Sequence, residues 1–192
     1  MSEPATHHIG TLSPEMALLG MLYNTSGHGY DLHRMVITDL GQVWHLSQSQ
    51  AYSILKRLES RGDVSAEEVP QEKLPPRQLL QMTAKGRTRF LAWLETPSGG
   101  STRVIRMEFI TRLYFLRQYF PEKIGQAFDL QRDEAKNQIR RLEIVRSQLP
   151  TSQTFNRMSL NLRLKQMNCV LEWLADCQAE FQTTPKNQYK GI

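Results

Sequence analysis

The chain has 192 residues, of which 40% are hydrophobic and 22% are charged, and its formal net charge is +5 at pH 7. This composition is that of an ordinary globular protein with room for one large domain or two small ones. The longest apolar run, within residues 17–22, is far too short to cross a bilayer, and residues 2–10 lack a signal-peptide pattern. These features exclude a protein built on membrane-spanning apolar helices, and we expect a cytoplasmic protein.

The positive charge is concentrated in the second half of the chain. Residues 1–96 contain 9 Lys and Arg against 10 Asp and Glu, whereas residues 97–192 contain 15 against 9. Within the first half, only residues 43–94 have a positive balance, with 8 cations and 5 anions. Net charge alone therefore gives little support for nucleic-acid binding by the first half.

Residues 1–12 resemble a disordered leader, and two short helices are predicted after it. Ser13 is expected to cap the first helix and Pro14 to be its first residue, a position that tolerates proline. Its apolar residues cover most of the helix circumference, which indicates a central place in a small core. A second helix is predicted over residues 28–40, where Gly41 ends it.

The third predicted helix, residues 47–61, carries the pattern that bears most on function. Ser47 and Gln50 have the spacing of a capping box, and Gly62 provides the stop. Ala51, Ile54, Leu55 and Leu58 fall on one face. The opposite face and its flanks carry hydroxyl, amide, phenol and cationic side chains, which are Gln48, Ser49, Gln50, Tyr52, Ser53, Lys56, Arg57 and Ser60.

Two readings of that polar face remain open from the pattern alone. Hydroxyls, amides and cations are the groups that pair with base edges and phosphates in a DNA major groove. An ordinary solvated helix face is the alternative. Three helices with short connectors, the third one polar-faced, nevertheless match the plan of a helix-turn-helix domain.

A β-hairpin with a long tip is predicted after Gly62. Residues 64–69 and 78–82 have strand character, and the tip over residues 70–76 contains three prolines. This hairpin is interpreted as a wing. A fourth helix then begins near Thr83 and ends near residue 95, where the turn-rich segment 96–102 is interpreted as a linker.

The region over residues 103–182 is predicted to be purely helical, and residues 183–192 to be a frayed tail. Helices are expected at residues 103–119, 122–149 and 155–182. The last contains an apolar seam with steps of three, four and seven, made of Leu160, Leu164, Met167, Leu171, Leu174 and Phe181. The seam is either a dimer interface or the core of an intramolecular bundle. Cys169 and Cys177, about 12 Å apart on that helix, are too distant for an internal disulfide.

The order of motifs closely resembles the PadR family of winged helix-turn-helix transcriptional regulators. The likeness is carried by residues 17–20, 28–32, 44–47, Tyr52, 55–59, Gly62, 75–77, 82–83 and 86–87. Residues 106–109 and 112–115 resemble the long helical C-terminal domain of the AphA-type branch. The resemblance implies a mainly α fold with a small β-wing (α+β), in which a winged helix-turn-helix domain at 13–95 precedes an α-helical dimerisation domain at 103–182.

The resemblance further implies a homodimer that binds operator DNA, often as a repressor, and in some members is released by a small hydrophobic or aromatic molecule. Two features depart from the family pattern. Leu79 and Leu80 stand where family wings commonly have aromatic residues, and the wing tip carries little basic charge.

The first functional hypothesis is therefore a sequence-specific DNA-binding regulator that reads an inverted repeat. Base contacts are assigned to Gln48, Ser49, Gln50, Ser53 and Lys56, and phosphate contacts to Tyr52, Arg57, Lys73 and Arg77. The alternative hypothesis is a protein–protein scaffold that keeps the winged helix without reading DNA. The negative balance of residues 1–96 favours this alternative.

No motif for catalysis, phosphate binding or a cofactor is present, so an enzyme and a resident cofactor are not expected. His28, His33 and His45 lack the Cys or carboxylate neighbours typical of a metal site, and no metal is assigned. Aromatic residues between the two predicted domains form a candidate effector pocket, with packing in the core as the alternative: Trp93, Phe109, Tyr114, Phe115 and Trp173.

Overall fold

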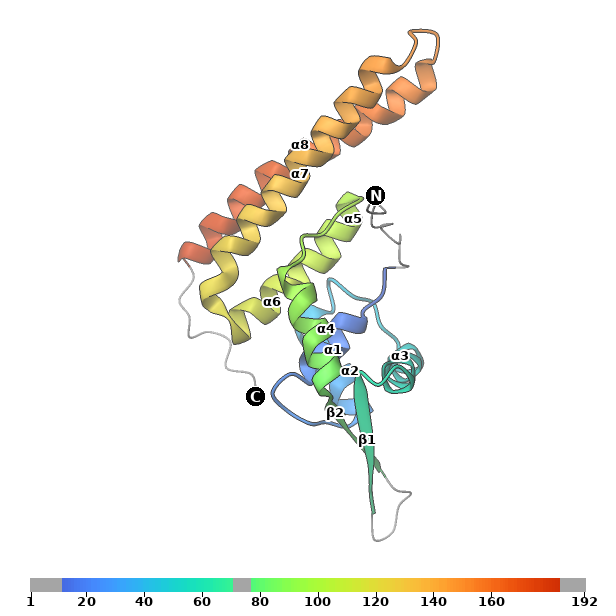
Figure 1. Cartoon of the computed structure of the whole chain (residues 1–192), viewed down its shortest axis with the longest axis vertical. Helices are drawn as coiled ribbons and strands as arrows, with labels where there is room; N and C mark the ends of the chain where they lie inside the picture. The colour runs from blue at the N-terminus through green and yellow to red at the C-terminus, as the bar shows by residue number, and fades with distance from the viewer. Residues whose placement is uncertain (1–11, 71–76, 184–192) are drawn as a thin grey trace, which may run out of the picture. The chain divides into compact units, whose positions relative to one another are not determined.

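A computed structural model describes residues 12–70 and 77–183 of the chain. The chain divides into two compact units, Met1–Trp93 and Leu94–Ile192, which are described separately below (Figure 1). The segment 96–102, interpreted from the sequence as a linker, lies in the second unit. Within the described ranges, no helix has both the length and the apolar character needed to cross a membrane.

In its described residues, the first unit contains four helices: α1 (Glu15–Met21), α2 (Gly29–Leu40), α3 (Gln48–Ser60) and α4 (Ala84–Glu95), the last of which ends just beyond the unit boundary. The predicted central place of α1 is confirmed, because Ala17, Leu18 and Leu19 are fully buried. The predicted cap of α1 is wrong. Pro14 occupies the cap position without a side-chain hydrogen bond, and the Ser13 hydroxyl instead lies 3.5 Å from Arg57 Nη2.

The predicted wing is an antiparallel pair of strands, β1 (Val64–Val69) and β2 (Arg77–Met82). Their register runs from Val64 opposite Met82 to Val69 opposite Arg77. Leu80 is 4% exposed and exchanges backbone hydrogen bonds with Gly27, so this position of the wing faces the core and not a partner. Residues 71–76 of the predicted wing tip lie outside the described residues.

Up to residue 183, where its description ends, the second unit contains helices and no strands, and the helices lie at the positions that the sequence predicts. They are α5 (Thr102–Val104), the π-helical turn η1 (Ile105–Phe109), α6 (Ile110–Tyr119), the 3-10 turn η2 (Pro121–Lys123), α7 (Ile124–Gln148) and α8 (Thr154–Thr183). The π-helical turn was not predicted. The helices α7 and α8 lie side by side as a long antiparallel hairpin (Figure 1).

The segment after α4 is fastened to α7 by a buried polar network. Ser98 is 1% exposed, and its backbone N–H and C=O bond the side-chain amide of Gln131, each at 2.8 Å. Arg112 Nη1 donates to Ser98 Oγ at 3.2 Å. Burial lowers the pKa of Arg112 to about 10, although the Glu108 carboxylate acts in the opposite direction. Residues 96–102 are therefore held by specific contacts at Ser98.

Candidate nucleic-acid interface

The local sequence of α3 fixes where the helix begins and ends. Ser47 Oγ accepts from the Gln50 N–H at 3.3 Å, and Gln50 Oε1 accepts from the Ser47 N–H at 3.0 Å, which completes the predicted capping box. Gly62 follows the helix with φ +73°, a conformation that favours glycine. The predicted start and stop signals are therefore confirmed.

The helix divides into an inner and an outer face, as its sequence predicts. The four aliphatic residues Ala51, Ile54, Leu55 and Leu58 are between 0% and 7% exposed. The α3 residues assigned to DNA are all exposed, and they are Gln48, Ser49, Gln50, Tyr52, Ser53, Lys56 and Arg57. In Figure 1, α3 is viewed along its axis at the edge of the first unit. The polar face is therefore not packed beneath another part of this unit.

Some hydroxyl groups of this face already form hydrogen bonds within α3 or with its cap residue. Ser53 Oγ donates to the Ser49 carbonyl at 2.9 Å, and the Ser49 and Ser47 hydroxyl oxygens lie 3.1 Å apart. With its proton used in this way, the Ser53 oxygen presents lone pairs outward. It can therefore accept a hydrogen bond from a base amino group, such as N4 of cytosine or N6 of adenine.

Tyr52 lies on one flank of α3 against the start of α2. A Cβ placed on Gly29 would be 2.8 Å from Tyr52 Cε1, so the glycine leaves room for the ring. Tyr52 remains 48% exposed. The phenol therefore has a side supported by α2 and a side open to solvent, which suits a group that contacts the DNA backbone.

Arg57 lies on the other flank and is held by a carboxylate. Its Nε donates to Glu15 Oε1 at 2.7 Å, and Glu15 also accepts from Arg61 Nη2 at 2.6 Å and from Arg89 Nη2 at 2.9 Å. Burial by itself would raise the pKa of Glu15, but hydrogen bonds from Arg89 and Arg61 and the charges of Arg61 and Arg57 outweigh it and lower the pKa. No sequence pattern indicates this cluster, because Glu15 and Arg57 are 42 positions apart.

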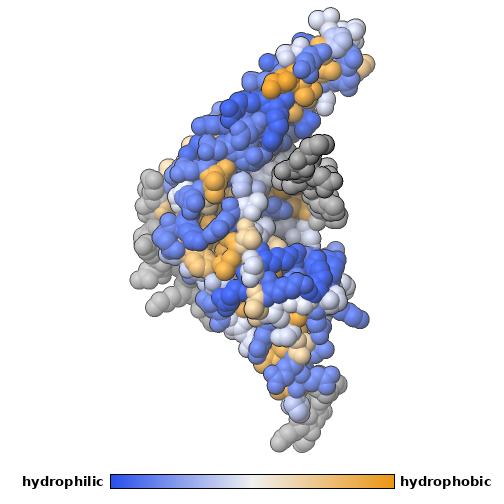
Figure 2. Space-filling model, viewed as in Figure 1, coloured by the Kyte–Doolittle hydropathy of each residue, from blue (hydrophilic) through white to orange (hydrophobic). Residues whose placement is uncertain are grey.

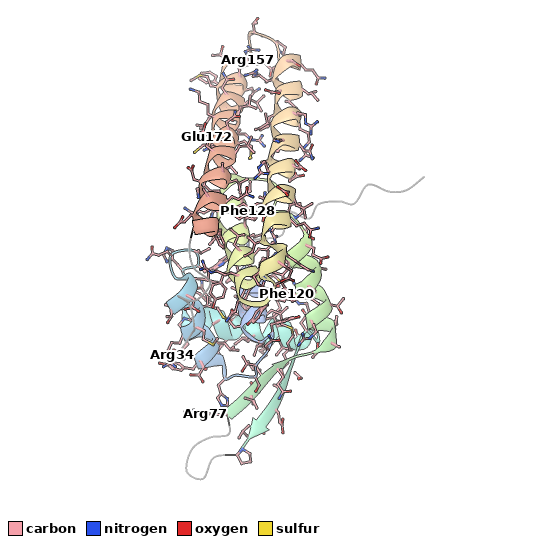
Figure 3. All side chains as sticks on the ribbon, turned by 90° about the vertical axis from the view of Figure 1, so that its left-hand side faces the viewer. Arg34, Arg77, Phe120, Phe128, Arg157 and Glu172 are labelled. Atoms are coloured by element: carbon pink, nitrogen blue, oxygen red, sulfur yellow. The ribbon has the colours of Figure 1, made fainter. Side chains whose placement is uncertain are left out.

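The wing contributes a mixture of charges. Arg77 is exposed on β2 near the outer end of the described wing (Figure 3). On the paired strand β1, Glu67 and Glu68 are also exposed. Their negative charges would repel DNA phosphates. Lys73, the other predicted phosphate contact of the wing, lies outside the described residues. Among the described residues, α3 therefore offers more cations for contact with the phosphate backbone than the wing does.

Two of the histidines considered for a metal site have structural hydrogen bonds. His33 Nε2 donates to the Leu46 carbonyl at 2.7 Å and so ties α2 to the turn that precedes α3. His28 Nδ1 donates to the Gln78 carbonyl of β2 at 2.8 Å. In the part of the chain that the structure describes, no group of three His, Cys, Asp or Glu side chains is arranged to hold a metal ion.

The aromatic residues proposed for an effector pocket are largely packed. Phe109 and Phe115 are fully buried. The Phe109 ring meets the edges of Phe128 and Trp173, with ring centres 5.3 and 6.2 Å apart. Tyr114 contacts Phe115, and in the first unit Trp93 stacks on Phe90. These contacts favour the packing alternative for the buried members of the set.

The apolar seam of α8 faces α7 within the same chain. Leu160, Leu164, Met167 and Leu174 are between 0% and 8% exposed, and Leu160 and Leu164 pack with Leu142 of α7. Leu171 is half-buried, and Phe181 contacts Phe128 of α7 with ring centres 5.9 Å apart. These contacts favour the intramolecular alternative for the seam over the predicted dimer interface, because the antiparallel hairpin covers most of it.

The winged unit matches a known protein family. The family model described as the transcriptional regulator PadR-like family matches residues 18–92. A curated relative, the negative transcriptional regulator PadR of Bacillus subtilis, is 26% identical over 122 residues, which span 62% of this chain and 66% of the relative.

Solved structures provide further likenesses. Bacillus subtilis PadR in complex with operator DNA has a TM-score of 0.44 and 22% identity, over 87% of this chain and 98% of that chain. The same protein in complex with p-coumaric acid has a TM-score of 0.38 and 21% identity, over 89% of this chain and 96% of that chain.

Proposed function

We propose that this chain is a sequence-specific DNA-binding regulator that inserts α3 into the major groove, a function supported by the match of residues 18–92 to the model of the PadR-like family of transcriptional regulators. The observation that carries the proposal is the partition of α3. Its aliphatic residues are buried while its amides, hydroxyls and Lys56 are exposed. A solvated surface helix typically carries Glu and Lys, whereas this outer face presents the groups that read base edges.

The proposed contacts follow from the geometry of that face. Gln48, Gln50, Ser49 and Ser53 would contact base edges, Lys56 would bind a guanine or a phosphate, and Tyr52 and Arg77 would contact the backbone. By analogy with the negative regulator of Bacillus subtilis, we propose repression as the outcome of binding. Two copies would read an inverted repeat with half-sites about 34–36 Å apart.

Reading an inverted repeat requires a dimer. The subunit contact would use the face of the α7–α8 hairpin that points away from the apolar seam. Large apolar side chains lie exposed near the loop that joins α7 to α8, where hydrophobic surface is visible in Figure 2. On α8, Phe155, Met158 and Leu162 follow one another at steps of three and four and are 86%, 61% and 58% exposed. Steps of three and four keep side chains on one face of a helix, so these residues form a stripe opposite the covered seam.

The charge along the hairpin supports an antiparallel arrangement of two copies. Residues 136–165 contain seven Lys and Arg and one Glu, whereas residues 124–135 and 166–183 together contain one Arg and six Asp and Glu. Figure 3 shows Arg157 at the far end of α8 and Glu172 nearer its other end. Antiparallel hairpins would place the cationic half of each copy beside the acidic half of the other, whereas parallel hairpins would oppose like charges.

A small-molecule effector would find one candidate site in the second unit. A pocket of about 110 Å³ lies between Gly100–Thr102, Gln138 and Leu142 of α7, and Arg163, Gln166 and Met167 of α8. Gln138 Oε1 is buried there without a hydrogen-bond partner. A molecule with a hydroxyl donor for Gln138 and a carboxylate for Arg163 would suit this pocket, and a gain in thermal stability that Gln138→Leu abolishes would test it.

Selection of bound sequences from random DNA duplexes with the purified full chain tests the proposed function. We expect enrichment of an inverted repeat, and we expect Lys56→Ala to flatten the plot of log affinity against log salt by about one unit. Lys136→Ala, a change of an exposed cation in the second unit, is the matched control and should leave the slope unchanged. Recovery of no sequence preference would favour the protein–protein scaffold.

Size-exclusion chromatography with light scattering tests the dimer separately. Leu162→Glu should convert the wild-type dimer into a monomer, because it buries a charge in the proposed contact. Asn161→Glu, at the neighbouring exposed position, should leave the dimer intact. A dimer that survives Leu162→Glu would exclude this face as the subunit contact.

A further inference from the structure

Five charged side chains, from α1, α3, α4 and the turn after α3, converge beside the end of α3. Glu15 of α1 bonds Arg57, Arg61 and Arg89 at 2.6–2.9 Å. Asp63 bonds Arg89 at 2.6 Å and lies 3.5 Å from Arg61. The two carboxylates are the least exposed of the five, with the Glu15 side chain 12% and the Asp63 side chain 1% exposed. The Arg57 side chain is the most exposed, at 50%.

The three arginines differ in how many carboxylates hold them. Arg61 and Arg89 each have an ion pair with both Glu15 and Asp63, whereas Arg57 has its ion pair with Glu15. Loss of the Glu15 charge would therefore leave Arg61 and Arg89 paired with Asp63 and would deprive Arg57 of its ion pair. Hydrogen bonds between two ionised groups are stronger than neutral ones, so the Glu15 carboxylate determines where the Arg57 guanidinium lies.

The position of Arg57 gives this pairing a consequence for DNA binding. Arg57 follows Lys56 in the chain and lies on the flank of the same outer face. In the arrangement observed, its Nε points to α1 and donates to Glu15. A guanidinium neutralised by an adjacent carboxylate displaces fewer counterions from a phosphate backbone than a free one.

We propose that Glu15 is a positioning residue for DNA recognition, which holds Arg57 against α1 and so withdraws it from the phosphate contacts of α3. This inference rests on the proposed function, because it concerns which cations of α3 meet the duplex. It assigns the phosphate contact at this end of α3 to Lys56, and it makes Arg57 an anchor between α3 and α1. The carboxylate of Glu15 occupies the place at Arg57 that a phosphate would otherwise take.

Fluorescence anisotropy with a DNA duplex over a salt series tests the inference in four proteins: wild type, Arg57→Ala, Glu15→Gln and the double variant. Arg57→Ala should have the salt slope of the wild type, because a cation that contacts no phosphate releases no counterion. Glu15→Gln should steepen the slope by about one unit, since it removes the charge that neutralises the Arg57 guanidinium. The double variant should return to the wild-type slope, which a general effect on folding would not produce.

A second readout does not depend on DNA. In nuclear magnetic resonance spectra of the free full chain, the Arg57 Nε–H signal should be protected from solvent exchange in the wild type. In Glu15→Gln this protection should fall, because a neutral amide oxygen accepts more weakly than a carboxylate, while that of Arg89, which Asp63 still holds, should persist. Circular dichroism establishes that each variant is folded.

The outcomes separate the two proposals. A slope that falls by one unit in Arg57→Ala and is unchanged in Glu15→Gln would make Arg57 a direct phosphate contact and would overturn the inference. An Arg57 signal without protection in the wild type would overturn it as well. A wild-type chain that binds no duplex while Arg57 is protected would remove the proposed function and the role of Glu15 in recognition, and would leave Glu15 as a stabilising residue.

Discussion

The α-carbon of Gly86 lies directly against the backbone carbonyl of Asp63, so closely that a Cβ at position 86 would be 2.0 Å from that oxygen. Thr83 also connects α4 to this turn. Its Oγ1 accepts from the Gly86 N–H at 3.0 Å and donates to the Gly62 carbonyl at 2.7 Å. The first turn of α4 is therefore tied to the residues that link α3 to the wing.

Gly86→Ala should consequently destabilise the first unit. The methyl group meets backbone atoms that cannot rotate away, so we expect a loss of about 2–3 kcal/mol in the free energy of unfolding, measured by urea denaturation. Gly125→Ala is the matched control, because a Cβ there meets nothing within 4 Å in the first turns of α7. It should change stability by at most about 1 kcal/mol and in the favourable direction. Equal stability of the two variants would contradict the close approach.

The features that could be predicted from the sequence are those encoded by local spacing. The capping box at Ser47 and Gln50, the stop at Gly62 and the inner face of α3 each depend on residues within about four turns of one helix. The wing and the three long C-terminal helices were predicted for the same reason. Periodicity determines which side chains share a face, and burial then follows from their chemistry.

The features that could not be predicted are pairings between distant segments. The contact of Glu15 with Arg57 joins residues from separate helices, and no spacing rule links them. The seam of α8 illustrates the same limit. Its heptad pattern shows that one face must be covered, but a partner helix in the same chain and one in a second copy satisfy that pattern equally. The packing of Leu160 and Leu164 against Leu142, which favours the partner in the same chain, cannot be read from the heptad pattern.

Removal of the α3 cap should weaken the helix proposed to read DNA. Ser47→Ala leaves the Gln50 N–H without its acceptor, and we expect a loss of about 1 kcal/mol in the free energy of unfolding. Ser47→Asp should retain most of the stability, because a carboxylate also caps. Ser60→Ala, at the exposed end of the same helix, is the control and should stay within about 0.5 kcal/mol of wild type. A Ser47→Ala protein with wild-type stability would show that the cap contributes nothing measurable.

The lowered pKa of Glu15 predicts a specific dependence of stability on pH. The folded protein binds the Glu15 proton less readily than the unfolded chain, whose ordinary value is 4.5. The contribution of Glu15 to stability is therefore complete above pH 4.5 and is lost as the pH falls through the folded value. The difference in unfolding free energy between wild type and Glu15→Gln should be largest near pH 7 and should shrink below pH 4.5.

Urea denaturation at pH 7 and at pH 3.5 measures this difference. Glu143→Gln, a change of an exposed carboxylate on α7, serves as the control and should alter stability by less than about 0.5 kcal/mol at pH 7. A gap between wild type and Glu15→Gln that is equally large at both pH values would mean that the arginines do not stabilise the ionised form of Glu15.

The stability of the second unit should depend on Gln131, as that of the first unit depends on the contact of Gly86 with Asp63. Gln131 satisfies both the N–H and the C=O of Ser98, and all of these groups are buried. In Gln131→Leu both backbone groups would be left unpaired away from water, at a cost of about 1–3 kcal/mol each. Hydrogen exchange of the Ser98 amide should accelerate accordingly, and urea should unfold the variant at a lower concentration. Gln126→Leu, an exposed position on the same helix, should change neither measurement. If the Ser98 amide exchanged at the same rate in both variants, the segment after α4 would be held by Arg112 and its neighbours and not by Gln131.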